Sequence, residues 1–204
     1  VDLCWRIASI FWKTKRITSK VPELLEEYVT NVKGLKAESK VRLYGNIGQL
    51  YSIDGDYSVA LQYCWRGLEL LESSPLIPNR SKYMSKFLAV LGDNAYGLEQ
   101  YQTAIEYYEQ SLEIFQKRED DDLLADASLA LVNEGAAYLE LGQHKKVLSV
   151  LDELGELIPK IPESQKDDIQ ILRGNLRAQL YIDEGNLEQA EYELEAAKGV
   201  AEHR

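Results

Sequence analysis

The side chains able to do nucleophilic, acid–base or metal chemistry are few and scattered. There are two histidines, His144 and His203, and two cysteines, Cys4 and Cys64. None has the spacing of a catalytic or metal-binding motif, and the sequence contains no glycine-rich phosphate loop, His-Glu-x-x-His or Gly-x-Ser-x-Gly. We therefore expect no enzymatic activity, no cofactor and no metal site in this chain.

One dense group of carboxylates, the run Glu119-Asp120-Asp121-Asp122, could be considered for metal binding. Calcium loops need ligands spaced along the loop and a glycine at the turn, and a contiguous run of acids does not supply that arrangement. Acidic residues at the start of a helix are favoured by the helix dipole. The run is therefore interpreted as the solvated beginning of a helix.

The cellular compartment is suggested by what the sequence lacks. There is no Cys-x-x-Cys pair, no stretch of about 18 consecutive apolar residues and no apolar run after a basic start near the N-terminus. We expect two reduced, partly buried thiols, no membrane span and a cytoplasmic location. Because the chain begins without methionine and ends in a helix-like segment, we expect a fragment of a longer protein.

Charge is distributed unevenly along the chain. The net charge is −11, yet residues 1–42 carry +4 and the remainder carries −15. An acidic protein is poorly suited to the phosphate backbone of nucleic acids, which needs a basic surface. We therefore expect a protein or peptide partner and no direct contact with nucleic acid or membrane.

A ten-residue pattern recurs along the chain. Its copies end at positions 60, 104, 147 and 190, so successive steps are 44, 43 and 43 residues. A fainter copy at residues 12–21 makes five units, at approximately 2–35, 41–74, 85–118, 128–161 and 171–204. The four clear copies read YSIDGDYSVA, AYGLEQYQTA, YLELGQHKKV and YIDEGNLEQA.

Each unit has the pattern of two helices joined by a tight turn. Apolar residues in the first helix fall at helical spacing. Gly55, Gly142 and Gly185 come where that helix must end, because glycine readily adopts the left-handed conformation. The small residue that closes each pattern, such as Ala60, would let the second helix approach closely. Neither helix alone can bury its apolar stripe, so the sequence predicts an all-α array of stacked hairpins.

These residues resemble the tetratricopeptide repeat (TPR) signature, Trp-x2-Leu-Gly-x2-Tyr followed by Ala-x3-Phe. In the second unit the matching residues are Tyr44, Ile47, Gly48, Tyr51 and Ala60. The resemblance implies a single right-handed superhelical solenoid of about five hairpins over residues 1–204. The usual period is about 34 residues, and the longer period here is similar to kinesin light chains, to adaptors with repeated Asn-Leu-Gly motifs and to bacterial peptide-sensing regulators.

The resemblance also implies where a partner binds, namely the concave groove lined by the first helix of each unit. Its N-terminal part would be basic and polar and its C-terminal part apolar. Asn46 and Asn133 occupy the same position in two different repeats, where a side-chain amide can bind a peptide backbone. Alternatively, both asparagines cap or bridge neighbouring helices. The expected binding residues are Arg6, Lys13, Arg42, Asn46, Gln49, Lys86, Tyr96, Leu129, Val132, Asn133, Leu139 and Asn175.

The function expected is a protein- or peptide-binding scaffold or sensor. Two alternatives stay open, a regulatory module for an output domain outside this chain, and homo-oligomerisation through the apolar C-terminal groove. A carboxylate clamp of the kind used by chaperone-binding relatives has three matches, Arg6, Asn46 and Lys86, but Ile10 and Val90 occupy its other two slots. Glu134 and Arg177, at one slot of adjacent units, are expected to form an ion pair between repeats.

Overall fold

The computed structural model describes residues 20–118 and 124–202. Within these ranges all regular secondary structure is helical, with nine α-helices, one short 3-10 helix and no strand. The predicted all-α class is therefore confirmed. The chain divides into two compact units, residues 1–100 and 101–204, and each is described by itself. The prediction of one solenoid domain over the whole chain stays a prediction.

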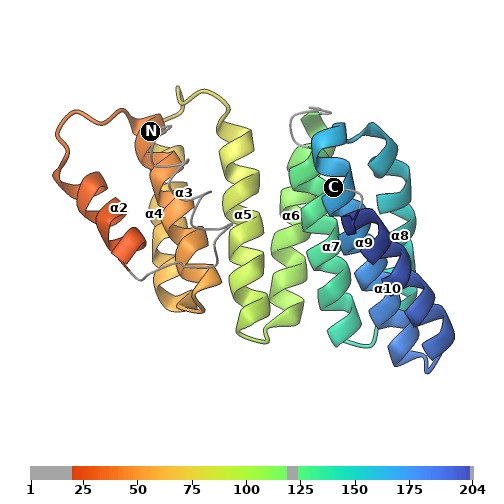
Figure 1. Ribbon diagram of the computed structural model, residues 1–204. Coiled ribbons are helices and arrows are strands. Elements are labelled where there is room, and N and C mark those ends of the chain that lie inside the picture. The colour runs from red at the N-terminus through yellow and green to blue at the C-terminus, as the bar shows by residue number, and fades with distance from the viewer. Residues whose placement is uncertain (1–19, 119–123, 203–204) are drawn as a thin grey trace. The chain divides into compact units, whose positions relative to one another are not determined.

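The first unit contains four helices in its described part (Figure 1). Helices α3 and α4 form a hairpin, α2 packs against α3, and α5 packs against both members of the hairpin. The second predicted unit, at 41–74, thus corresponds to the α3–α4 hairpin. The bounds are α2 Lys20–Asn31, α3 Ala37–Ile53, α4 Tyr57–Ser73 and α5 Arg80–Gly97.

The second unit contains, in its described part, five α-helices and the 3-10 helix η2. Helix α7 packs against α6, α8 and α9, while α9 and α10 lie side by side along their lengths (Figure 1). The fourth and fifth predicted repeats, at 128–161 and 171–204, overlap the α7–α8 and α9–α10 hairpins. The bounds are α6 Tyr101–Arg118, α7 Leu124–Glu140, α8 His144–Leu157, η2 Ile158–Lys160, α9 Glu163–Asp183 and α10 Leu187–Glu202.

Four helix ends share one hydrogen-bonded turn. In each, a backbone N–H donates to the carbonyl five residues earlier, the bond that closes a Schellman-type helix end. Gly55, Gly142 and Gly185 adopt positive φ of 81°, 65° and 76°, as predicted, and Glu99 takes the same conformation with φ 61°. The four bonds run from Asp56 to Tyr51 (2.9 Å), Gln100 to Ala95 (2.9 Å), Gln143 to Tyr138 (2.9 Å) and Asn186 to Tyr181 (2.7 Å).

The core of the first unit explains the seven-residue spacing of its tyrosines. Tyr44 and Tyr51 lie on one face of α3, and the ring of Tyr63 from α4 lies 6.0 Å from each of theirs, centroid to centroid. Leu43 and Ile47 of α3 complete this core together with leucine and valine side chains of α2. Two turns of an α-helix contain about seven residues, so this spacing returns both tyrosines to the same partner.

Small side chains allow the paired helices to approach closely. The closing residues of the repeat are all buried, and three of them are the alanines predicted to let the helices approach closely. They are Ala60, Ala104, Val147 and Ala190. Opposite Ala60, a Cβ added to Gly48 would lie only 3.1 Å from the Sγ of Cys64. Burial raises the pKa of the Cys64 thiol to about 12, so this thiol stays neutral at physiological pH and is a poor nucleophile.

Candidate functional site

The binding residues predicted on α3 lie together on one face. Arg42, Asn46 and Gln49 are separated by four and three residues, which places them on one side of a helix, and all three are half-buried. The side-chain amides of Asn46 and Gln49 form no hydrogen bond to another residue in the described part of the chain. Arg42, in contrast, already interacts with another group of the protein. The α3 face therefore offers two amide groups whose donors and acceptors are not used within the described protein.

Helix α5 supplies the neighbouring part of this surface. Lys86 is exposed and Tyr96 is half-buried, and both interact with other groups of the chain. The Tyr83 hydroxyl donates a hydrogen bond to Glu38 Oε1 at 3.0 Å, which ties the start of α5 to α3. Burial, reinforced by the Glu38 carboxylate, raises the pKa of Tyr83 to about 12, so the hydroxyl remains a donor near neutral pH.

The ring of Phe87 sets how closely α5 approaches the α3–α4 hairpin. A Cβ added to Gly45 of α3 would lie 3.6 Å from the ring, an ordinary contact, whereas one added to Gly67 of α4 would overlap the ring. Gly67 therefore provides the space that Phe87 fills, and Phe87 is buried. This packing fixes α5 beside the α3 face that carries Asn46 and Gln49.

In the second unit the predicted residues differ in how much surface they offer. Leu129 is 41% exposed, but Val132 is only 7% exposed and can offer little contact area to a partner. Asn133 and Leu139 are half-buried on α7, and Asn175 is exposed on α9, which packs against α7. Asn133 interacts with another group of the chain, whereas the Asn175 side chain bonds to no other described residue.

Several residues singled out from the sequence lie outside the described residues. They include the expected binding residues Arg6 and Lys13, the thiol of Cys4, His203 and the acidic run 119–122. Among the described residues, no group of three or more histidine, cysteine or acidic side chains could hold a metal ion. Val90, at one slot of the carboxylate clamp, is buried and cannot replace the cation expected there.

The ion pair predicted between Glu134 and Arg177 is wrong. Arg177 Nη1 donates to Glu193 Oε1 at 3.2 Å, so the pair forms within the α9–α10 hairpin. The spacing of the repeats placed Glu134 and Arg177 in one slot but did not show which neighbouring helix each would face. Arg177 therefore takes its partner from the second helix of its own hairpin.

Glu134 is only 6% exposed, and its neighbours are side chains of the second compact unit. Burial is the main reason why its pKa rises to about 7, and the carboxylates of Glu109 and Glu153 raise it further. A hydrogen bond with Tyr138 acts in the opposite direction. Tyr138 also donates to Glu109 Oε1 at 3.2 Å. The sequence signal for this cluster was a glutamate in a slot that is usually leucine.

The side chain of His144 lies beside a carboxylate of another helix. Its Nε2 lies 3.7 Å from Asp183 Oδ2, which links the start of α8 to the end of α9. Lys146, two residues later, places its Nζ 4.5 Å from the centre of the Tyr138 ring. Both contacts join neighbouring helices, so these polar residues serve helix packing in the second unit.

No helix in residues 20–118 or 124–202 is both long and apolar enough to cross a membrane.

Comparison with known proteins supports the repeat assignment. Residues 84–154 match the tetratricopeptide repeat family model. A search of curated protein sequences gives no significant match. The resemblance to TPR proteins is thus confirmed over a segment that runs from α5 to α8.

Solved structures extend the likeness over almost the entire chain, as a likeness of fold. BtubC (BKLC) from P. vanneervenii is 16% identical, with a TM-score of 0.73, over 99% of this chain and 80% of that protein. The nearly identical TPR-like repeats of a kinesin light chain-type protein from Podosopora anserina are 18% identical, with a TM-score of 0.65, over 98% and 94%. The apo form of RapI is 15% identical, with a TM-score of 0.67, and this chain covers 53% of it. The predicted fold, an all-α solenoid of TPR-like hairpins, is confirmed.

Proposed function

We propose that this chain, whose residues 84–154 match the tetratricopeptide repeat family, is a protein-interaction module. Each of its two units binds an extended peptide segment along its own first helices, α3 and α5 in one unit and α7 and α9 in the other. TPR-like arrays are typically non-catalytic scaffolds for protein partners. The observation that carries the proposal is the α3 face, where Asn46 and Gln49 are half-buried and bonded to no other described residue.

Amides suit this role because a peptide backbone needs one donor and one acceptor per residue. A side-chain amide offers both and reads no side chain of the ligand. Arg42 and Lys86, on the same two helices, would attract acidic side chains of the ligand. Leu129 and Leu139 on α7 would contact apolar ones. The first unit therefore favours an extended peptide with acidic residues, and the second unit favours one with apolar residues.

The proposal can be tested with peptides selected from a random display library against the whole chain. Affinities for the selected peptides would be measured by fluorescence anisotropy for wild type, Asn46→Ala and Asn133→Ala. Gln62→Ala is the matched control, because Gln62 is an exposed amide on the second helix, α4. We expect Asn46→Ala to weaken binding by about 1–3 kcal/mol, added salt to weaken it further, and Gln62→Ala to change nothing.

Two results would overturn this assignment. In one, Asn46→Ala binds like wild type once folded but melts earlier, which makes the amide structural. In the other, the selected peptides bind only to an assembly of several chains, seen as a concentration-dependent mass in light scattering. That result would favour homo-oligomerisation through the apolar part of the groove.

A further inference from the structure

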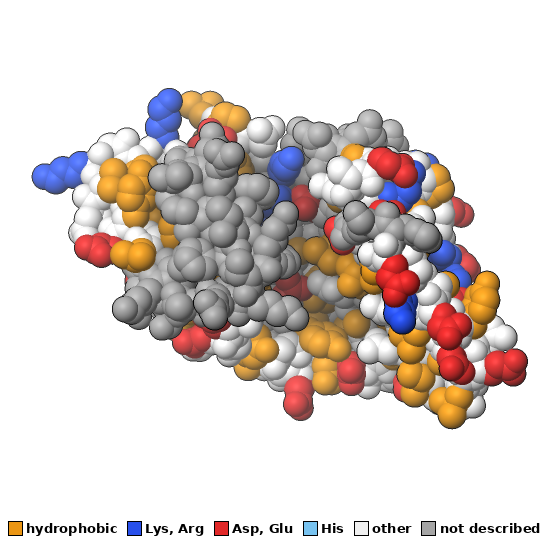
Figure 2. Space-filling model, viewed as in Figure 1, with side chains coloured by type: hydrophobic (Ala, Val, Ile, Leu, Met, Phe, Trp, Pro, Cys, Tyr) orange, Lys and Arg blue, Asp and Glu red, His pale blue; other side chains and the backbone are white. Residues whose placement is uncertain are grey.

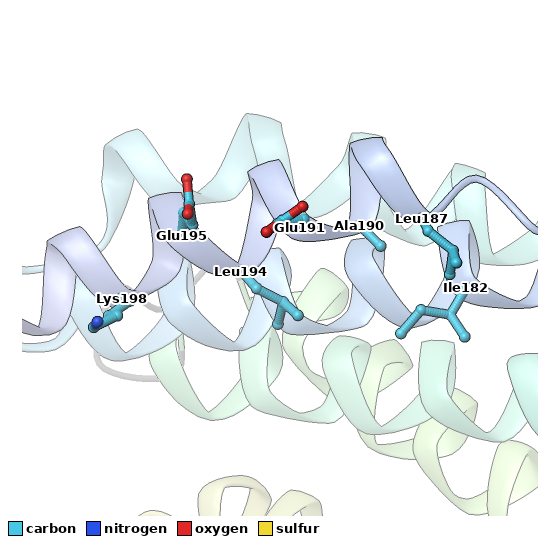
Figure 3. A pocket seen from close by; sticks show the side chains of 7 residues that line it. All are labelled: Ile182, Leu187, Ala190, Glu191, Leu194, Glu195 and Lys198. Atoms are coloured by element: carbon cyan, nitrogen blue, oxygen red, sulfur yellow. The ribbon is translucent and has the colours of Figure 1, made fainter.

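A second apolar surface is built mainly by the last helix, α10. It is a hollow of about 360 Å³, and we name it the end face. Its apolar members include Ile182, Leu187 and Leu194, which are all exposed. Figure 3 shows Leu187, Leu194 and Lys198 following one another along α10, with Ile182 of α9 beside Leu187. The lining residues are Ile182, Leu187, Ala190, Glu191, Leu194, Glu195 and Lys198.

The equivalent residues one repeat earlier show how such a surface is covered by the next helix. Leu151 of α8 precedes Leu194 by one period of 43 residues. Leu151 is 1% exposed and Leu194 is 46% exposed. The difference arises because α9 packs beside α8, whereas no described helix covers the corresponding side of α10. The end face is therefore the stacking surface of the α9–α10 hairpin.

The contacts that α9 makes with the preceding hairpin, α7–α8, define the chemistry of a suitable cover. Arg173 Nε donates to the Leu151 carbonyl at 3.0 Å, and its guanidinium lies against Gly155. The carboxylate of Asp152 attracts this guanidinium. Three residues farther along α9, Leu176 is buried against Gly135 of α7. The cover is thus a helix with an apolar stripe and an arginine beside it.

Charge on the end face favours the same kind of helix. Glu195 takes the place of Asp152 one repeat later, and Glu191 takes the place of Leu148. Lys198, the cation of the end face, places its Nζ 3.7 Å from Glu202 Oε1, so its positive charge is compensated by that carboxylate. The rim is therefore acidic, and Figure 2 shows hydrophobic and acidic side chains side by side in the area where α10 lies in Figure 1.

The same charges disfavour a second copy of this chain as the occupant. A symmetric dimer would bring the Glu191 and Glu195 carboxylates of both copies together in a chain of net charge −11. A helix carrying arginine or lysine beside its apolar stripe would meet opposite charge instead.

We propose that the end face binds an amphipathic helix of a protein partner, with leucine or isoleucine in a stripe at helical spacing and arginine or lysine on its flanks. The helix would lie beside α10 as α9 lies beside α8. Its apolar stripe would cover Leu187, Leu194 and Ile182, and its cations would meet Glu191 and Glu195. The end face shares no residue with the α3 face, so the two proposals can fail independently.

The test uses two synthetic fluorescein-labelled helical peptides. Both carry leucines at i, i+3 and i+7; one has arginines flanking the stripe and its twin has glutamates there. Binding to the whole chain is measured by fluorescence anisotropy. We expect the arginine peptide to bind saturably and the twin to bind at least about tenfold more weakly. Leu194→Ser should weaken binding of the arginine peptide by about tenfold.

Two further variants decide between packing and charge. Glu191→Lys combined with Glu195→Lys changes only exposed residues, so it should fold normally and reverse the preference between the peptides. Tyr192→Ser is the matched control, because Tyr192 is an exposed apolar residue of α10 outside the end face; it should bind like wild type.

Three outcomes would overturn the proposal. One is the absence of saturable binding of the arginine peptide to the wild-type chain. Another is equal binding of both peptides to wild type and to the charge-reversed variant. The third is a dimer of the wild-type chain, seen by sedimentation equilibrium and lost in Leu194→Ser, which would assign the face to a second copy.

Discussion

One position of the repeat, the core slot, holds apolar residues in the first compact unit and charged residues in the second. In the first unit it holds Ile47 on α3 and Leu91 on α5, both fully buried. In the second it holds Glu134 on α7, also buried, and Arg177 on α9, whose side chain is 27% exposed and paired with Glu193. The fold therefore tolerates charge at a core slot, provided that neighbouring helices supply polar partners.

This difference gives the two units different sources of stability. Burial of apolar side chains is insensitive to protonation, so the slot stabilises the first unit equally at any moderate pH. A buried carboxylate costs free energy when it is charged. Because the pKa of Glu134 rises to about 7, the second unit should be the part whose stability responds to pH near neutrality.

The largest expected effect comes from emptying the slot in the first unit. Leu91→Ala removes a fully buried side chain and should lower the free energy of unfolding by about 2–5 kcal/mol, as truncations that leave a cavity do. Urea denaturation monitored by circular dichroism measures this loss. A loss below about 1 kcal/mol would mean that the slot is not a packed core position and that the comparison fails.

The next effect concerns the close packing of the Phe87 ring against glycines of α3 and α4 in the first unit. Gly67→Ala would overlap the Phe87 ring and should destabilise the protein by about 1–3 kcal/mol. Gly45→Ala meets the same ring at 3.6 Å and should be neutral or stabilise by up to about 1 kcal/mol, because alanine favours helices more than glycine. Thermal melts of the two variants give the contrast, and equal shifts in the melting temperature would rule out Phe87 as its cause.

The pH dependence of the second unit can be isolated with Glu134→Gln. Since the folded-state pKa is raised from 4.5 to about 7, the native state holds this proton more tightly than the unfolded state. Wild type should therefore lose stability as pH rises from 4.5 to about 7, by up to roughly 3 kcal/mol. The glutamine variant should lack this loss and be the more stable protein at pH 8. Unfolding free energies of the two proteins that stay parallel across this range would contradict the explanation.

The smallest effect is expected for the Arg177–Glu193 pair. Both side chains are partly exposed, 27% for Arg177 and 17% for Glu193, so water screens the pair and it should contribute only about 1 kcal/mol. A double-mutant cycle with Arg177→Met and Glu193→Gln measures the coupling. A cycle of Arg177→Met with Glu134→Gln is the matched comparison and should show little direct coupling. A larger coupling there would restore the pair between repeats.

Which features could be predicted from the sequence depends on how locally they are determined. Gly55, Gly142 and Gly185 indicated helix ends because the left-handed conformation that ends a helix depends mainly on the type of the residue that adopts it. The closing alanines were predictable because they recur at one period. The environment of Glu134 was not, because its burial depends on which side of α7 faces Tyr138 and Glu109. Exposure of Leu194 could not be read from the pattern either, since Leu151 at the same repeat position is buried.

Backbone amide NMR tests most directly whether partners bind along the first helices. A ¹⁵N-labelled sample would be titrated with a peptide selected from the display library, and chemical-shift changes would be mapped by residue. We predict that a peptide bound to the first unit gives its largest changes on α3 and α5 around Asn46, Gln49 and Lys86, and that a peptide bound to the second unit gives them on α7 near Asn133. Changes confined to the second helices α4, α6 and α8, with α3 unaffected, would contradict this binding mode.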